Sequence, residues 1–212
     1  MKLVPLTVIL SLPILGACGP TGFASSATAS RVAPASGGTV NLSLSSESNR
    51  SVSRAGVGTV AYVSGTDVDR GQIVAAAGIS GTPNVGAART SGSGTYTTRY
   101  QYVVVDNITR TDTLISGTRG EEAGTMSLAA DFDAGTLTGS TSELTVNGTI
   151  SGSDVGGNVT ANYSGSVLGG GTISGSVNGE LAGDIGTNGV IATFHGSDNN
   201  TVMAGGLVGS AD

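Results

Sequence analysis

The sequence predicts an all-β domain in which antiparallel strands close into a small barrel. The segment Thr95–Val105 alternates with a period of two: Tyr96, Tyr100 and Tyr102 share one face, and the other face is mostly polar. Further strand-like segments follow at even spacing, separated by turn signals rich in Gly, Asn and Asp. No stretch shows convincing helical periodicity, and this combination is typical of an antiparallel sandwich or barrel.

The expected strands cover most of the chain after its first third. In order they are 57–63, 95–105, 109–116, 125–132, 136–140, 143–150, 158–166, 171–181, 189–195 and 201–208. The chain has 36 glycines, and a small barrel needs the strong coiling and tight turns that glycine permits. Because large side chains are few, Val, Leu, Ile, Ala and Thr are expected to fill the interior, which argues against a roomy ligand cavity inside the barrel.

A β-solenoid is the competing architecture. The sequence Gly-Thr-Ile-Ser-Gly-Ser occurs at Gly148–Ser153 and again at Gly171–Ser176. A solenoid needs three or more units at a fixed period, and only these two copies are clear. The barrel is therefore favoured.

The N-terminus has the pattern of an exported lipoprotein. Leu3–Leu15 is an apolar run shorter than the roughly 20 residues that cross a bilayer, and it fits a secretory signal instead. Leu-Gly-Ala-Cys at positions 15–18 resembles the bacterial lipobox, which implies cleavage before Cys18 and acylation of its thiol. A plain signal peptide with a chance cysteine is the alternative, but Cys18 is the only cysteine and has the required spacing. The predicted organisation is a signal peptide at 1–17, the lipidated cysteine with a disordered, flexible tether at 18–38, and a barrel domain at 39–212.

The charge balance is acidic and excludes two classes of partner. Lys2 is the only lysine, so eight arginines face fifteen acidic residues, and Arg119 is the last basic residue apart from His195. Such a chain lacks the basic footprint that nucleic acid requires, and anionic lipid head groups would repel it. Membrane attachment is therefore expected through lipid on Cys18, which is stable when more than one acyl chain is present.

Three blocks resemble the transferrin-binding protein B family of surface lipoproteins. Gly124–Gly139 resembles a barrel hairpin in which a strand ends in Asp-Phe, turns through glycine and returns as Thr-Leu-Thr-Gly. Phe194–Gly209 is similar to the family's closing hairpin, with Ser197 in place of the usual proline. Gly56–Gly65 is similar to an early barrel strand.

This resemblance implies an eight-stranded barrel that is lipid-anchored in the outer membrane, faces the exterior and binds a host or environmental ligand through loops. Gly19 stands where an Asp would imply retention in the inner membrane. The larger receptors of the family have two lobes, each with a handle domain beside its barrel. This chain has room for one barrel and little else, so transferrin binding is not carried over.

The residues that carry chemistry in enzymes are scarce. His195 is the sole histidine, and with no free thiol or second imidazole the usual nucleophile–base pairs cannot be assembled. Asp131 and Asp133 could bind a cation or act as paired carboxylates, but a turn role is favoured because Asp bonds its own backbone in turns. The same holds for Asp67 with Asp69 and for Glu121 with Glu122, and 198–200 is expected at a hairpin tip. No catalytic residue, cofactor or metal site is predicted.

Two features are candidates for ligand contact. Tyr96, Tyr100 and Tyr102 could form a recognition surface, because tyrosine is enriched in binding patches, or could face the barrel interior; core packing is favoured. The long segment Thr66–Gly94, which carries Arg70 and Arg89, is the expected place for specificity.

The functional prediction is a non-enzymatic, surface-exposed outer-membrane lipoprotein that acts as a binding or interaction module, with a protein as the candidate ligand. The alternative is a structural envelope lipoprotein that docks on a periplasmic or outer-membrane partner. A small-molecule carrier ranks third because it needs an internal cavity, and an enzyme ranks last.

Overall fold

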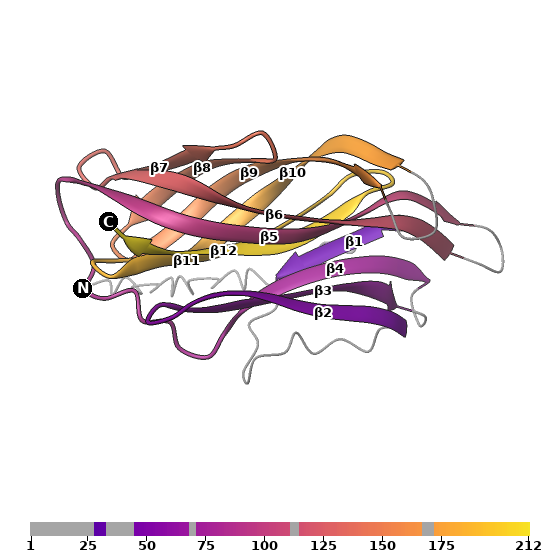
Figure 1. The fold of residues 1–212 in the computed structure, drawn as a ribbon, viewed down its shortest axis with the longest axis horizontal. Helices are drawn as coiled ribbons and strands as arrows, with labels where there is room; N and C mark the ends of the chain where they lie inside the picture. The colour runs from indigo at the N-terminus through magenta and orange to yellow at the C-terminus, as the bar shows by residue number, and fades with distance from the viewer. Residues whose placement is uncertain (1–27, 33–44, 68–70, 111–114, 167–171) are drawn as a thin grey trace, which may run out of the picture.

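The computed structural model describes residues 28–32, 45–67, 71–110, 115–166 and 172–212, and all regular structure in these ranges is β-strand (Figure 1). In chain order the strands are β1 Thr28–Val32, β2 Ser45–Arg54, β3 Gly58–Asp67, β4 Gln72–Ser80, β5 Ser93–Arg110, β6 Ile115–Asp131, β7 Thr136–Ser140, β8 Leu144–Ser151, β9 Asp154–Ser166, β10 Thr172–Ile185, β11 Gly189–Ser197 and β12 Val202–Ala211.

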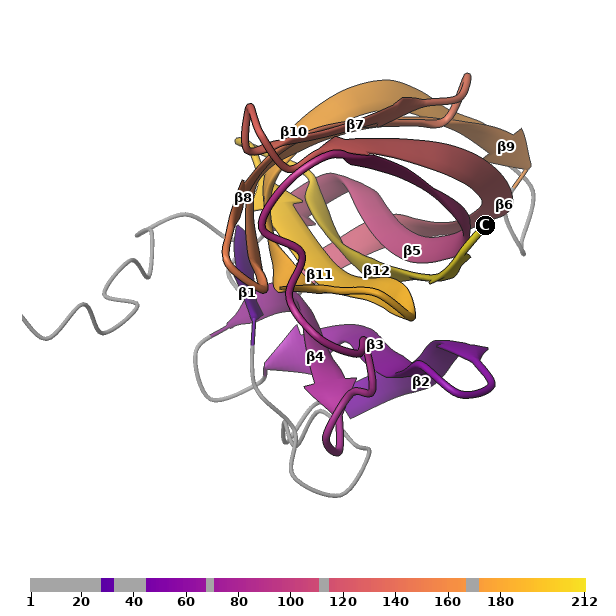
Figure 2. The ribbon, with the colours of Figure 1, turned by 90° about the vertical axis from the view of Figure 1, so that its left-hand side faces the viewer.

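Strands β5–β12 form a closed barrel. Their order around it is β10-β11-β12-β5-β6-β7-β8-β9, and every neighbouring pair is antiparallel (Figures 1 and 2). The predicted all-β, eight-stranded antiparallel barrel is therefore confirmed. Residues 148–151 of the first Gly-Thr-Ile-Ser-Gly-Ser copy lie in β8 and residues 172–176 of the second lie in β10, both strands of this barrel, so the copies are not solenoid units.

A second sheet lies against one side of the barrel, which the sequence analysis did not predict. Its order is β1-β4-β3-β2, with β1 parallel to β4, and it lies beneath β11, β12 and β5 in Figure 1. The expectation that Gly56–Gly65 forms an early barrel strand is wrong, because β3 belongs to this smaller sheet. The barrel itself begins only at Ser93, and β1 lies within the range 18–38 for which a tether is predicted. Residues 1–17 and Cys18 lie outside the described residues.

The barrel interior is built around the aromatic face of β5. The predicted alternation holds: Tyr96, Tyr100 and Tyr102 point inward and are at most 2% exposed. The rings of Tyr100 and Tyr102 stack with centroids 6.3 Å apart, and Phe194 on β11 meets Tyr102 edge-on at 6.0 Å. Since each ring buries a large apolar area, this cluster fills much of the interior, together with Phe132, Tyr163 and aliphatic side chains.

The tyrosine hydroxyls bond to the chain on the other side of the barrel. Tyr96 Oη donates to the carbonyl of Gly186 at 2.8 Å, and Tyr102 Oη contacts the carbonyls of Glu143 and Asn162 at 3.0 and 2.7 Å. On the neighbouring strand, a Cβ at Gly124 would lie 2.4 Å from Tyr100 Oη, so only glycine leaves room for that phenol. These hydrogen bonds therefore link β5 to chain segments on the other side of the barrel interior.

The small sheet and the barrel share a second hydrophobic core. It contains apolar residues of β2, β3 and β4 together with Val103 and Val105 of β5, and Val202, Ala204 and Val208 of β12. The two sheets pack tightly where Val60 of β3 meets Gly206 of β12, because a Cβ on this glycine would lie 2.3 Å from Val60 Cγ1. As a result β12 is buried on both faces over Val202–Gly209.

We expect Gly206→Ala to lower the free energy of unfolding by about 1 to 3 kcal/mol, because the added methyl group overpacks the contact with Val60. Chemical denaturation followed by circular dichroism measures the change. Gly165→Ala is the matched control, since a Cβ there has nothing closer than 4.0 Å. Equal stability of the two variants would contradict the close packing of the two sheets.

All five tyrosines should resist ionisation in the native protein. Burial raises the pKa of Tyr62, Tyr96, Tyr100, Tyr102 and Tyr163 above the ordinary 10.0, and that of Tyr62 to about 12. The unfolded chain ionises first as pH rises, so the stability is complete below pH 10 and is lost above it.

Ultraviolet absorbance of tyrosinate measures this directly, because the chain has no tryptophan. At pH 10 the denatured chain should be about half ionised and the native protein nearly un-ionised. Native and denatured titration curves that coincide would refute the buried tyrosine core.

Candidate functional site

The junction of the small sheet and the barrel also carries polar contacts. Arg54 Nη2 donates to Ser210 Oγ at 2.8 Å, and Arg50 Nε lies 3.3 Å from Glu121 Oε2. Tyr62 Oη donates to Gln101 Oε1 at 3.4 Å from within the apolar interface. These bonds join β2 and β3 to three barrel strands, so the two sheets form one body with a fixed junction.

Backbone hydrogen bonds hold the segment between β4 and β5 against one end of the barrel. The carbonyl of Val85 accepts bonds from the N–H groups of Asn188 and Gly189 at 2.7 and 3.2 Å, and that of Ala87 accepts one from Thr187 at 2.9 Å. The Arg89 guanidinium lies 5.2 Å from the centre of the Phe132 ring, within cation–π range. Over its described residues, the predicted specificity segment Thr66–Gly94 thus comprises the end of β3, strand β4, the hydrogen-bonded connection to β5 and the first two residues of β5. Arg70 lies outside the described residues.

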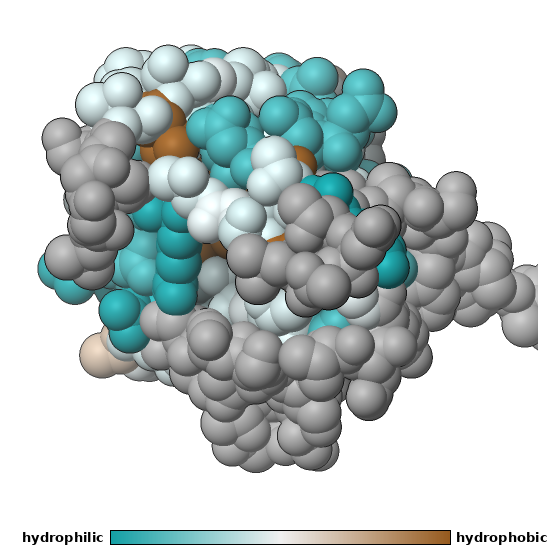
Figure 3. All heavy atoms as spheres, turned by 90° about the vertical axis from the view of Figure 1, so that its right-hand side faces the viewer, coloured by the Kyte–Doolittle hydropathy of each residue, from teal (hydrophilic) through white to brown (hydrophobic). Residues whose placement is uncertain are grey.

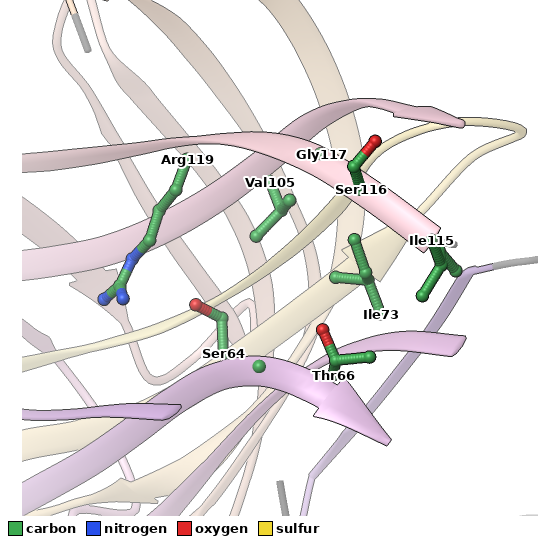
Figure 4. A pocket seen from close by; sticks show the side chains of 9 residues that line it. Ser64, Thr66, Ile73, Val105, Ile115, Ser116, Gly117 and Arg119 are labelled. Atoms are coloured by element: carbon green, nitrogen blue, oxygen red, sulfur yellow. The ribbon is translucent and has the colours of Figure 1, made fainter. Parts of the chain in front are cut away.

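A cavity of about 210 Å³ opens between the two sheets, near the end of β3 and the start of β6 (Figure 4). The small sheet contributes Ile73 and the hydroxyl residues Ser64 and Thr66. The barrel side is lined by Val105, Ile115, Ser116, Gly117 and Arg119. The walls therefore combine aliphatic carbon, hydroxyl groups and one guanidinium.

The cavity lies towards the end of the molecule that faces the viewer in Figure 3. The described surface there is mostly hydrophilic or intermediate in hydropathy, and a few hydrophobic residues show between the polar ones.

Arg119 is the principal charged group of the cavity. Its Nη2 donates to Glu121 Oε1 at 2.6 Å, which fixes the guanidinium, while its Nε is buried and has no hydrogen-bond partner. Glu121 also pairs with Arg50, so its carboxylate lies between two guanidinium groups, one from the small sheet and one from the barrel. Beside them the pKa of Tyr62 is raised to about 12, by burial first and then by the charge of Glu121, so this phenol stays neutral.

The tyrosine stripe does not form an exposed recognition surface. Tyr96, Tyr100 and Tyr102 lie inside the barrel, where the outer walls and the hairpins surround them. A macromolecule that docks on the outside of the barrel would not contact these rings. The interpretation as the inward, core-packing face is the one that the geometry supports.

The predicted acidic pairs lie in turns or on opposite faces. Asp131 Oδ1 accepts bonds from the N–H groups of Asp133 and Ala134 at 3.0 and 2.8 Å, which closes the β6–β7 turn. Asp198 likewise accepts from the N–H of Asn200 at the β11–β12 hairpin tip. Glu121 and Glu122 are consecutive on β6 and so point to opposite faces. Asp67 ends β3 and is 6% exposed, and Asp69 lies outside the described residues.

Within the described ranges, three or more His, Cys, Asp or Glu side chains never gather closely enough to hold a metal ion. A search of the same residues for a helix long and apolar enough to cross a membrane finds none.

Neither the inter-sheet cavity nor the small sheet that forms one of its walls was predicted from the sequence. A signal was present in Val103-Val104-Val105 and in the run 202–208, where apolar residues are consecutive instead of alternating. A strand with an unbroken apolar run is covered on both faces, so these segments indicate a second layer against the barrel. Arg119 itself has no distinguishing pattern in the sequence.

Comparison with known proteins gives structural matches. No family model matches the chain, and no curated protein sequence does. Similar solved structures are the isotype 1 transferrin binding protein B of serogroup B Neisseria meningitidis (15% identity, TM-score 0.43, 81% of this chain and 36% of that one) and intact Ap-TbpB with its N and C lobes (14%, 0.41, 78% and 38%). A third is a double mutant of transferrin binding protein B from Haemophilus parasuis Hp5 (16%, 0.38, 77% and 36%).

All three are transferrin binding proteins B, the family that the sequence blocks resemble. The chain spans little more than a third of the length of each of these proteins.

His195 lies on β11 opposite Glu180 of β10, with Nε2 4.0 Å from Glu180 Oε2. Burial lowers the pKa of this sole histidine below 6.5, and the carboxylate of Glu180 only partly offsets the effect. The unfolded chain therefore protonates first as the pH falls, and stability is lost below pH 6.5.

We expect His195→Gln to reduce the loss of unfolding free energy between about pH 7.5 and about pH 5. Urea denaturation at the two pH values measures the difference, and the titration of the single histidine by NMR gives its pKa independently. An unchanged pH dependence in the variant, or a native pKa above 6.5, would disprove the effect of burial.

Proposed function

We propose that this protein is a lipid-anchored, outer-membrane binding module that faces the cell exterior and carries no catalytic activity. The observation that carries the proposal is the cavity at the junction of two rigidly packed sheets, with Arg119 in its wall. Tyrosine rings and aliphatic side chains fill the interior of the barrel, so the protein binds its ligands outside that interior. A carrier that encloses its cargo within the barrel is disfavoured for the same reason.

The anchor is Cys18, and the position of β1 limits how far the domain can stand from the membrane. Since β1 starts at Thr28, the connection Gly19–Ala27 has nine residues. At most about 3.5 Å per residue, it reaches no more than about 30 Å. The acidic domain gains no attraction from anionic head groups, so acyl chains on Cys18 supply the attachment.

An epitope tag inserted after Gly152 tests location and orientation together. Gly152 is in the exposed β8–β9 turn and has open space around its Cα, so an insertion there should be tolerated. Amine-reactive surface labels are unsuitable because Lys2 is the only lysine. We expect antibody to stain intact cells of the source organism and a palmitate analogue to label the tagged protein.

Cys18→Ala is the matched control and should abolish both labelling and membrane retention. Staining only after the outer membrane is permeabilised would contradict surface exposure and favour an envelope component that docks on a periplasmic partner. Membrane retention of the Cys18→Ala variant would contradict the lipid anchor.

Trypsin treatment of intact cells gives a second readout. Arg110 ends β5 and is exposed, so cleavage there is more readily achieved than at Arg99, which lies within a barrel strand. Release of peptides that end at Arg110, with periplasmic controls intact, is the expected result. Protection of Arg110 until the outer membrane is opened would contradict the outward orientation.

A further inference from the structure

We propose that the domain is held with one end of the barrel towards the membrane, and that the opposite end faces outward as the surface that partners meet first. The membrane-facing end, which we call the hairpin end, is formed by the β5–β6 and β11–β12 hairpins with Arg110, Ile115 and residues 197–202. The outward end, which we call the turn end, is formed by residues 85–89, 132–135, 152–153, 186–188 and 211–212. This inference rests on the proposed lipid anchor at Cys18 and adds the orientation that the anchor imposes.

The longest strands connect the two ends. At the turn end Ser93 of β5 pairs with Asp131 of β6, and at the hairpin end Arg110 pairs with Ile115. Figure 2 looks onto the turn end and Figure 3 onto the hairpin end. The barrel is therefore an elongated body with two distinct ends.

Strand β1 begins near the hairpin end. It runs parallel to β4, and its first residue, Thr28, pairs with Ile73 near the start of β4 (Figure 1). Ile73 lies beside β6, because a Cβ at Gly117 would lie 3.1 Å from Ile73 Cδ1. From Gly117, β6 continues to Asp131 at the turn end, and this part of the strand spans roughly 45 Å. The chain therefore leaves the described domain, on its way to Cys18, far from the turn end.

The short connection to Cys18 limits how the domain can stand on the membrane. Gly19–Ala27 has nine residues, and these reach no more than about 30 Å. A domain that stood on its turn end would hold Thr28 roughly 45 Å above the membrane, which is beyond that reach. The connection thus excludes the inverted orientation.

The distribution of charge favours the same orientation independently. Among the described residues, the turn end has two arginines, Arg54 and Arg89, against five aspartates: Asp131, Asp133, Asp154, Asp184 and Asp212. Towards the hairpin end the two signs are closer to balance, with Arg50, Arg110 and Arg119 against Asp67, Asp106, Glu121 and Asp198. Anionic head groups therefore repel the turn end more strongly, and this disfavours a domain that lies with its turn end on the membrane.

The turn end is a fixed surface. Backbone bonds already join the connection at Val85 and Ala87 to the β10–β11 turn, and Asp133 Oδ2 accepts a bond from the N–H of Gly92 at 3.1 Å. Thr187 and Asn188 of that turn are exposed beside the connection. A surface that is ordered before a partner arrives loses less conformational entropy on binding, so the outward end is suited to recognition.

The test uses the acylated full-length lipoprotein from the source organism, bound to preformed phosphatidylcholine–phosphatidylglycerol vesicles that carry a lipid-linked acceptor dye. Lys2 is the only lysine and lies in the predicted signal peptide, so one introduced lysine receives one amine-reactive donor dye. Asn199→Lys places the donor at the hairpin end and Ala134→Lys places it at the turn end, both at exposed positions. The parent chain, labelled in parallel, gives the background from the α-amino group of Cys18.

We expect at least about twofold more energy transfer in the Asn199→Lys variant than in the Ala134→Lys variant, because roughly 40 Å of strand separates the two positions. Equal transfer, or more transfer in the Ala134→Lys variant, would overturn the orientation. Flotation of the vesicles measures the anchor separately. A parent chain that does not float with the vesicles would overturn the anchor and the orientation together, whereas flotation with equal transfer would overturn the orientation alone.

A second pair of variants tests the part that β1 plays. Ala29→Pro combined with Ser30→Pro removes backbone donors from the pairing with β4, so β1 should detach. Residues 19–44 then separate Cys18 from β2, with a reach of about 90 Å, and the difference in energy transfer between the two labelled positions should be lost. Ser25→Pro combined with Ser26→Pro, within the connection itself, is the matched control and should keep the difference. An unchanged difference in the β1 variant would overturn the role of β1 in setting the orientation.

Discussion

The close packing of β3 on β12 is the contact on which the rest of the molecule depends. Because Gly206 has no side chain, Val60 of β3 packs directly against the backbone of β12, so one aliphatic side chain fills the space between the two strands. The same contact buries the second face of β12 and converts a separate sheet and barrel into one body. A four-stranded sheet alone could not bury enough surface to be stable, whereas against the barrel its inward residues become part of a continuous core.

A small number of large residues fill the interior of the barrel. Tyrosines on β5 cross the interior and bond to carbonyl and side-chain oxygens on the opposite wall, while Gly124 leaves the room that the phenol of Tyr100 needs. Large and small residues therefore alternate across facing positions, as dense packing requires. This arrangement explains why a chain with few aromatics places three of its eight on one face of one strand.

The cavity is a consequence of how the two sheets diverge. Near the start of β3, the backbone is tight against β11 and β12, where Gly58 and Val60 meet Ile191 and Gly206. Near the end of β3, Ser64 and Thr66 face β5 and β6 across open space instead. Glu121 pairs both with Arg50 of the small sheet and with Arg119 of the cavity wall, and these ion pairs couple the small sheet electrostatically to the barrel.

The sequence by itself determined the strand content, the hairpins and the inward face of β5, because these follow from a period of two and from local turn chemistry. It also determined the acidic charge and the turn roles of Asp131 and Asp198, which bond to backbone groups two or three residues away. Only the tertiary structure decided that β3 belongs to the smaller sheet and that the segment after β4 is hydrogen-bonded to the β10–β11 turn. It alone brought Arg119 opposite Ser64. These arrangements rest on contacts between residues that are far apart in the chain, and alternation along one strand shows which face is buried but not which partner buries it.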